Sequence, residues 1–285
     1  VMETGLLAFA YLILKCAVIR TDIKSSNRKN TIVSTIKKYI AGKLKVFFFE
    51  SRQSLGEQAA QDVAERIKKV SDEKESVRMV FAAAVSQKEF LEELLKIEDI
   101  PWQKITAFHM DEYHTIPNEA PQRFGNFLKE HLFQHKPFGA VHYMQSDFEA
   151  YSNLIDEANI DIICLGIGEN GHLAFNDPPV ADFKDPKVLK EVELDQICRQ
   201  QQVNDGQFKT LEDVPETAVT LTIPTLMKAD YLSVVVPGSA KAVAASKTLF
   251  HPVSEECPST VLRLHPDAKL YLDNHSAKNI IEKIS

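Results

Sequence analysis

A histidine and two aspartates stand where this chain could carry out proton-transfer chemistry. His172 follows the glycine-rich turn 165–168, and Asp177 comes five residues after it. Asp111 lies upstream, directly after another apolar run. Histidine is the side chain best suited to exchange protons near neutral pH, and a positioned carboxylate can act as a base. We therefore expect a catalytic centre around these side chains.

Both segments follow runs that are typical of buried strands, residues 160–164 before the glycine turn and residues 105–108 before Asp111. Open α/β sheets bind their ligands at the carboxyl ends of the strands. A glycine turn alone would indicate only the cap of a strand. The histidine and the acidic residue beside this one indicate a ligand site at that edge of the sheet.

Two motifs carry a resemblance to a known family. The run LGIGENGHLAFNDP at 165–178 resembles the GxGxDGHxAFNEP-like signature of the glucosamine-6-phosphate deaminase/isomerase family, and FHMDEY at 108–113 resembles its MDEY motif. The resemblance extends from about Leu44 to about Ser276. It implies a modified Rossmann-like sheet, also seen in 6-phosphogluconolactonase and ribose-5-phosphate isomerase. It also implies an enzyme that needs no cofactor and releases ammonia from an amino-sugar phosphate.

The resemblance assigns roles to the residues of both motifs. Asp111 would be the base that moves a proton from C2 to C1, and His172 would open the sugar ring. Asp177 and Asn170 stand where the family usually has two acids around the histidine. Asp177 keeps the charge with a shorter reach, whereas Asn170 can orient the ring by hydrogen bonding but not by charge. Gly171 is expected to contact the substrate.

A phosphate site is expected in the loop 82–87, between a strand and a helix N-terminus, which is a favourable place for an anion. Ser86 offers a hydroxyl, and Gln87 and Ala84 are expected beside it. The family commonly has Thr and Gly where Ala83 and Ala84 stand. The missing glycine could block close approach of a phosphate or demand φ values that alanine resists.

Two basic residues complete the expected substrate site. Lys241 lies in the loop 237–241, which opens a helix after a strand, and the resemblance assigns such a lysine to the sugar phosphate. Arg199, in the segment 198–205, resembles an arginine that a lid contributes to phosphate binding in some relatives. A surface arginine explains Arg199 equally well.

Strand and helix patterns alternate along the chain, which is typical of a mostly parallel sheet with helices on both faces. We expect one doubly wound α/β domain at 43–285, preceded by an extension at 1–42 outside the resemblance. The long charged segment 182–213 is expected to hold helix and loop and to act as a lid. The expected strands are 45–49, 77–82, 105–108, 141–144, 160–164, 219–223, 231–236 and 269–272. The expected helices are 34–41, 86–95, 123–132, 148–156 and 239–249, with one beginning at Ser54 through a capping box with Glu57 and one near Ser276.

Composition and charge exclude several classes of function. A net charge of −7 argues against a general nucleic-acid binder, which needs clustered Lys and Arg. The four cysteines form no CxxC pair, so we expect neither a metal site nor a disulfide framework, and a reducing cytoplasm fits. No GxGxxG fingerprint implies a nicotinamide cofactor. The apolar run 5–14 is shorter than the ~20 residues of a spanning helix, so membrane attachment is not favoured.

The leading hypothesis is therefore conversion of glucosamine-6-phosphate and water into fructose-6-phosphate and ammonia in amino-sugar catabolism. Galactosamine-6-phosphate differs at one hydroxyl, which the motifs do not report. 6-Phosphogluconolactonase shares the fold and a histidine motif, but residues 111–113 and 173–176 match the deaminase pattern better. A non-catalytic sugar-phosphate sensor is the alternative that Ala84 and Asn170 motivate. Many relatives assemble, so a homo-oligomer stays open.

Overall fold

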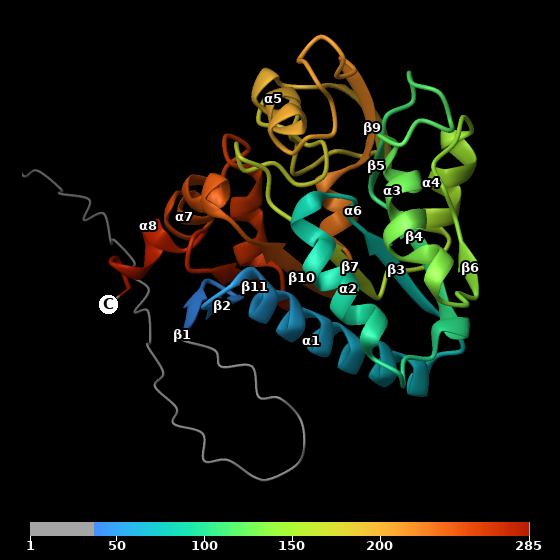
Figure 1. Cartoon of the computed structure of the whole chain (residues 1–285), viewed down its shortest axis with the longest axis horizontal. Coiled ribbons are helices and arrows are strands. Elements are labelled where there is room, and N and C mark those ends of the chain that lie inside the picture. Colours follow the sequence, from blue (N-terminus) through green and yellow to red (C-terminus); the bar gives the residue numbers. More distant parts are fainter. Residues whose placement is uncertain (1–36, 285) are drawn as a thin grey trace, which may run out of the picture.

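An eight-stranded sheet runs through the computed structural model, which describes residues 37–284 (Figure 1). Its strand order is β1-β2-β11-β10-β7-β3-β4-β6. Every neighbouring pair from β2 to β6 in this order is parallel, and β1 pairs antiparallel to β2 at the edge. The strands are β1 (Lys37–Ala41), β2 (Leu44–Phe49), β3 (Val77–Phe81), β4 (Ile105–His109), β6 (Ala140–Val141), β7 (Ile162–Leu165), β10 (Tyr231–Val236) and β11 (Ala268–Asp273). The predicted doubly wound, mostly parallel α/β fold is confirmed.

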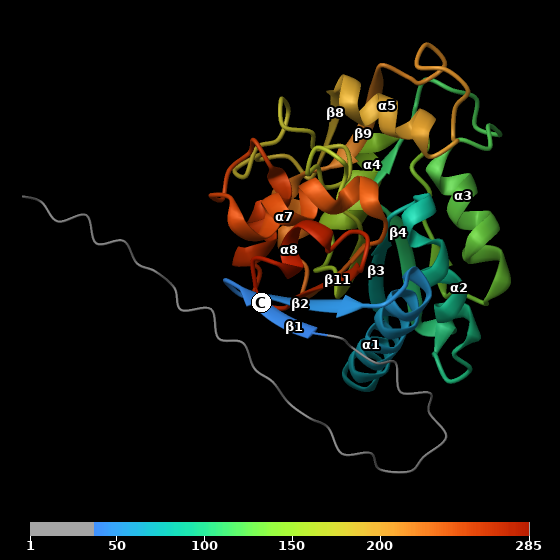
Figure 2. The same cartoon turned by 60° about the vertical axis from the view of Figure 1, so that its left-hand side comes forward.

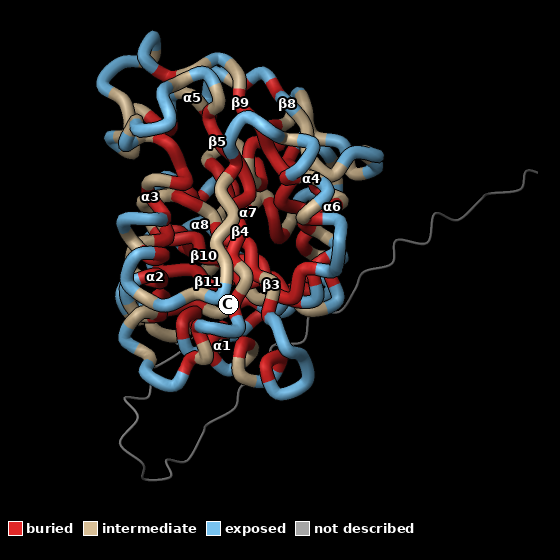
Figure 3. The backbone as a smooth tube through the Cα atoms, turned by 90° about the vertical axis from the view of Figure 1, so that its right-hand side faces the viewer, coloured by how far each residue is buried: buried red, intermediate tan, exposed pale blue. Residues whose placement is uncertain are grey.

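Helices cover both faces of this sheet, which is why its central strands are continuous apolar runs. All residues of β7 and β10 are buried. One apolar cluster joins one face of the sheet to α1 (Arg52–Glu73), α2 (Lys88–Lys96) and α3 (Phe124–His131). The other joins the opposite face to α4 (Phe148–Asp156), α6 (Ile223–Met227), α7 (Ala242–Phe250) and α8 (Lys278–Ile281). Figure 3 shows the buried residues gathered along the strands, with exposed loops around them.

The chain changes direction between β3 and β7. From β3 it passes outward to β4 and β6, returns to β7 on the other side of β3, and continues to β10 and β11. Such a switch point leaves a crevice at the carboxyl ends of the two adjacent strands. The loop after β3 and the glycine turn after β7 both open into this crevice.

A smaller antiparallel sheet stands above that crevice, with strand order β5-β9-β8 (Figures 1 and 2). Its strands are β5 (Asp111–Glu112), β8 (Leu189–Glu193) and β9 (Thr217–Leu221), and α5 (Gln196–Asn204) follows β8. The segment 182–213 therefore contains a strand as well as helix and loop, which corrects the expectation. The predicted strand 219–223 belongs to this antiparallel sheet, and its last residue starts α6. We call residues 182–213 the lid.

Several predicted helices and strands begin or end at residues other than those expected. Helix α1 is capped by Ser51, whose hydroxyl accepts from the Ser54 backbone N–H, while the Ser54 hydroxyl accepts from the Ser51 N–H. Ser54 therefore takes the role that we expected of Glu57, because a hydroxyl three residues after the cap can close the box as a Glu does. The strand expected at 141–144 ends at Val141.

The N-terminal part of the described chain forms a strand where a helix over 34–41 was predicted. β1 turns back onto β2 through Gly42, which has φ +61°. Pairing with a buried neighbour outweighs the weak helical pattern of so short a segment. The rest of that predicted helix and the apolar run 5–14 lie outside the described residues. The division at residue 42 stays a prediction, although the sheet begins within the extension. Among residues 37–284, no helix is long and apolar enough to cross a membrane.

Candidate active site

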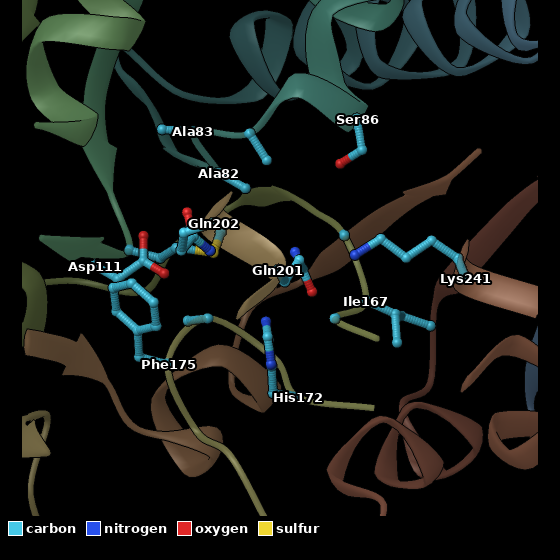
Figure 4. A pocket seen from close by; sticks show the side chains of 15 residues that line it. Ala82, Ala83, Ser86, Asp111, Ile167, His172, Phe175, Gln201, Gln202 and Lys241 are labelled. Atoms are coloured by element: carbon cyan, nitrogen blue, oxygen red, sulfur yellow. The ribbon is translucent and has the colours of Figure 1, made fainter. Parts of the chain in front are cut away.

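A pocket occupies the crevice at the carboxyl ends of β3 and β7, beneath the lid (Figure 4). It brings together side chains from the segments that follow β3, β4, β7 and β10, among them β5 of the smaller sheet, and from the lid helix α5. The residues that line it are Ala82, Ala83, Ala84, Ser86, Met110, Asp111, Gly166, Ile167, Gly168, His172, Ala174, Phe175, Gln201, Gln202 and Lys241. Of the predicted site residues, Asp111, His172, Ala84, Ser86 and Lys241 meet there, all within one chain.

Asp111 and Glu112 have separate functions. The Asp111 carboxyl lines the pocket and is only 7% exposed. Burial, and secondarily the charge of Glu112, raises the pKa of Asp111 well above its usual value. Glu112 instead accepts hydrogen bonds from the backbone N–H groups of Phe124 and Gly125 at 2.9 and 3.0 Å, at the start of α3. Glu112 therefore caps the start of α3, which leaves Asp111 available for chemistry.

His109 fixes the backbone of Asp111, a role that the sequence pattern did not indicate. Its Nδ1 lies 2.9 Å from the Asp111 carbonyl, and its Nε2 accepts from the Met144 N–H at 2.8 Å. Since Nε2 must be unprotonated to accept, the ring proton sits on Nδ1 and donates to the carbonyl. Burial lowers the pKa of His109 and so favours this neutral ring.

His172 points into the pocket, with its ring packed against Gly168 (Figure 4). A Cβ atom at position 168 would lie 2.1 Å from that ring, so only glycine fits there. The Nδ1 atom of His172 lies 2.8 Å from Oδ1 of Asp177. Two residues further on, Ala174 has φ +50°, a strained backbone for a residue with a side chain. The turn therefore holds the ring by close packing and by one carboxylate.

Asp177 is fully buried, yet it stays in its charged form. Burial by itself would raise the pKa of Asp177, but the charge and contact of His172 and a hydrogen bond from Asn170 hold that pKa below its usual value. A buried carboxylate with a lowered pKa can fix the orientation of the imidazole and stabilise its protonated form.

Asn170 connects two carboxylates. We had expected its side chain to orient the ring of His172, but it makes no hydrogen bond to that ring. Its Nδ2 donates to Oδ1 of Asp177 at 2.9 Å and to Oδ2 of Asp195 at 3.0 Å. Its Oδ1 accepts from the backbone N–H of His172 at 3.0 Å. An aspartate at position 170 would bring three carboxylates together with no proton donor between them. The asparagine is thus matched to Asp195, an acid on the lid that no sequence motif marked.

Cys198 lies close to His172 and Asp177. Ligand atoms of His172, Asp177 and Cys198 lie within 4.8 Å of one another, the one group among residues 37–284 that could hold a metal ion. Burial, and then the charge of Asp177, raises the pKa of the Cys198 thiol well above its usual value. A metal would have to displace that thiol proton, and the proton-transfer chemistry of the pair needs no metal. Sequence reasoning predicted no metal site and had assigned Cys198 no role.

Lys241 provides the positive charge of the pocket. It is only 6% exposed, and in the described part of the chain its ammonium group makes no hydrogen bond or ion pair. Burial lowers the pKa of Lys241, while the charges of Asp205 and Glu169 act in the opposite direction. A buried cation without a partner is costly unless an anion joins it, so this end of the pocket is suited to a phosphate.

The loop after β3 needs no glycine in this chain. Ala84 has φ −152°, an extended conformation that any residue adopts, so the expected backbone strain is absent. Ser86 lines the pocket beside Ala84. Gln87 does not, because its Nε2 donates to the Val235 carbonyl at 3.1 Å and holds the loop against β10.

Two further predicted residues lie outside the pocket. Arg199 donates to the carbonyls of Leu211 and Val214, both at 2.9 Å, so it supports the lid from within. Gly171 has φ +92°, and a Cβ there would lie 2.6 Å from Sγ of Cys257. Its role is therefore to let the turn pack closely, and it does not line the pocket.

The lid contributes two glutamines that sequence reasoning did not select, Gln201 and Gln202 of α5. Gln201 Oε1 accepts from the backbone N–H of Glu169 at 2.9 Å, which ties the lid helix to the glycine turn. Gln202 lines the pocket on the side of Asp111 (Figure 4). The run of glutamines at 200–202 was visible, but only the helix register shows which members face inward.

The sequence matches known proteins over most of its length. Residues 50–271 match a family described as glucosamine-6-phosphate isomerases/6-phosphogluconolactonase. The chain is 36% identical to the glucosamine-6-phosphate deaminase of Bacillus cereus over 189 residues. This matched region covers 64% of this chain and 70% of that protein. The deaminase of Bacillus thuringiensis gives the same identity and coverage.

Solved structures show the same fold. A monomeric glucosamine-6-phosphate deaminase superposes with a TM-score of 0.73 at 27% identity, over 82% of this chain and 99% of that one. The 6-phosphogluconolactonase of Thermotoga maritima superposes with a TM-score of 0.66 at 20% identity, over 81% of this chain and 100% of that one. The second similarity concerns the fold alone.

Proposed function

Because this chain belongs to the family of glucosamine-6-phosphate isomerases and 6-phosphogluconolactonases, whose members are enzymes acting on sugar phosphates, we propose that it deaminates and isomerises glucosamine-6-phosphate. The products would be fructose-6-phosphate and ammonia. The observation that carries the proposal is the arrangement of one pocket, with an unpaired buried lysine at one end, a buried carboxyl of raised pKa at the other and a His–Asp pair between them. The deaminases among the relatives support the same reaction.

The two ends of the pocket orient the substrate. The phosphate binds Lys241 and the hydroxyl of Ser86, because a dianion offsets the cost of keeping that cation buried. This places the opposite end of the sugar, with C1 and C2, beside Asp111 (Figure 4). Fixing both ends converts proton transfer into a step within one complex.

His172 opens the sugar ring. The ring oxygen must gain a proton while the hydroxyl on C1 loses one, and a single imidazole can pass a proton between them. Asp177 holds Nδ1 of His172, so the other ring nitrogen is presented to the sugar. The charge of Asp177 also stabilises the imidazolium that forms during the transfer.

Asp111 then acts on the open-chain sugar. The C2–H bond breaks, and Asp111 takes the proton. The electron pair of that bond forms a C1=C2 double bond, while the C1=O π pair moves onto the carbonyl oxygen, which gains a proton from the ammonium group of the substrate. The proton held by Asp111 returns to C1, leaving a C=N bond at C2 that adds water and expels ammonia. All electron pairs come from the substrate and water, so the base and hydrogen-bond donors suffice. A carboxyl of raised pKa is a stronger base than an exposed one, which suits the weak acidity of C2–H.

Substrate specificity is tested by offering three substrates to the purified full-length chain. We expect ammonia and fructose-6-phosphate from glucosamine-6-phosphate, and a lower kcat/KM or none with galactosamine-6-phosphate and 6-phosphogluconolactone. The lactone is the meaningful rival, because the His172–Asp177 pair alone could activate a water for its hydrolysis. Rapid lactone hydrolysis without ammonia release from either amino sugar would refute the proposal.

A further inference from the structure

Gln202 is a buried amide without a partner. Its side chain is only 7% exposed, and within residues 37–284 it makes no hydrogen bond. The adjacent Gln201 differs, since it bonds both the Glu169 N–H and the Asp205 carboxylate. The amide atoms of Gln202 are open to the pocket and have no protein partner among residues 37–284. An amide that faces a pocket in this state is available to a ligand.

The helix register directs Gln202 toward the reacting end of the pocket. Cys198 lies one turn earlier on the same face of α5, and its thiol is close enough to feel the charges of Asp177 and Asp111. Figure 4 shows Gln202 on the Asp111 side of the pocket, across from Lys241. A sugar phosphate held by Lys241 would therefore present its C1–C2 end to this amide.

The type of side chain fits an amine better than a second acid would. Asp111 already places one carboxyl group at this point, and a further negative charge would repel it. The amide offers an acceptor oxygen and two donor hydrogens without any charge. It can bind an amino group in either protonation state and then the leaving ammonia.

We propose that Gln202 is the specificity-determining residue for amino-sugar phosphates, and that its amide hydrogen-bonds the amino group on the carbon that Asp111 deprotonates. This inference rests on the proposed function and names the contact that selects its substrate. It explains why a lid helix, and not the parallel sheet, covers the reacting end.

The test measures binding of two unreactive open-chain analogues by calorimetry, 2-amino-2-deoxyglucitol-6-phosphate and 2-deoxyglucitol-6-phosphate. Wild type should bind the amino compound more tightly. Gln202→Leu should lose about tenfold of that preference while binding of the deoxy compound changes little. Gln200→Leu is the matched control, because Gln200 is exposed on the same helix and bonds only Asn204. Equal binding of both analogues by wild type, or an unchanged preference in Gln202→Leu, would overturn the inference.

Gln202→Glu guards against a folding defect, because it keeps the shape of the side chain. The added charge beside Asp111 should raise the pH at which kcat reaches half its maximum, with the melting temperature near that of wild type. An unchanged pH profile in a folded Gln202→Glu variant would also overturn the inference. Failure of wild type to bind either analogue would count against the proposed function itself, and failure of the amine preference alone would not.

Discussion

The main parallel sheet and the lid build the pocket by different means. The sheet positions Asp111, His172 and Lys241 by where its strands end, and buried apolar packing fixes those ends. The lid is held above them by the pairing of β8 with β9 and by a small set of buried side chains. Polar contacts to the glycine turn add to this, among them Gln201 to Glu169 and Asn170 to Asp195. The difference suggests that the sheet supplies the reactive groups, whereas the lid adjusts their environment. The three predictions below separate these contributions.

Of these three, the largest effect is expected at the phosphate end, in the sheet-derived part. Lys241→Met removes a buried cation that has no other partner, so binding of the sugar phosphate should weaken by about a hundredfold or more. The loss should appear in KM for glucosamine-6-phosphate. Lys228→Met is the control, since Lys228 is exposed outside the pocket. A KM that is equal for Lys241→Met and for the control would show that the anion binds elsewhere.

An intermediate effect is expected where the lid meets the His–Asp pair. Asn170→Asp would place three carboxylates within hydrogen-bonding distance, and kcat should fall by about tenfold or more because the lid helix and His172 lose their arrangement. The double variant Asn170→Asp with Asp195→Asn restores one amide between the acids. Steady-state kinetics should show that it recovers most of the loss. If the double variant is no better than Asn170→Asp alone, the lid does not act through this contact.

The smallest effect is expected on the melting temperature, and substitutions of Asp111 and Asp177 should change it in opposite directions. The folded-state pKa of Asp111 is raised, so this group costs stability as pH rises from its unfolded pKa toward the folded one. The folded-state pKa of Asp177 is lowered, so its contribution is present above its unfolded pKa and is lost as pH falls through the folded pKa. Near neutral pH, Asp111→Asn should therefore raise Tm and Asp177→Asn should lower it.

Each shift should amount to a few degrees, since about 1 kcal/mol moves the Tm of a domain of this size by about 2–4 °C. Scanning calorimetry of both variants beside wild type gives the comparison. Shifts of the same sign in both variants would contradict the assignment of Asp111 as the strained acid and Asp177 as the satisfied one.

Sequence patterns were sufficient for most of the parallel strands and insufficient for the lid. The strand ends at Asp111 and His172 could be predicted because apolar runs and glycine turns are local signals. The roles of Asn170 and Asp195 could not, since they depend on an acid 25 residues away that packing brings within 3.0 Å. Arg199 was one candidate for the phosphate site because segment 198–205 resembles a lid that contributes an arginine, yet its side chain donates to the carbonyls of Leu211 and Val214. Short segments such as β1 and β8 form strands through pairing with neighbours, which no local pattern reports.

The central claim is that Asp111 is the base for deamination of an amino-sugar phosphate. The most direct measurement is the rate at which ammonia and fructose-6-phosphate form from glucosamine-6-phosphate, for wild type, Asp111→Asn and the exposed control Asp156→Asn. We expect both products in equal amounts from wild type and from the control. In Asp111→Asn the rate should fall by about 10²–10⁴-fold, with the folded state retained. A folded Asp111→Asn variant that released ammonia at the wild-type rate would contradict the account.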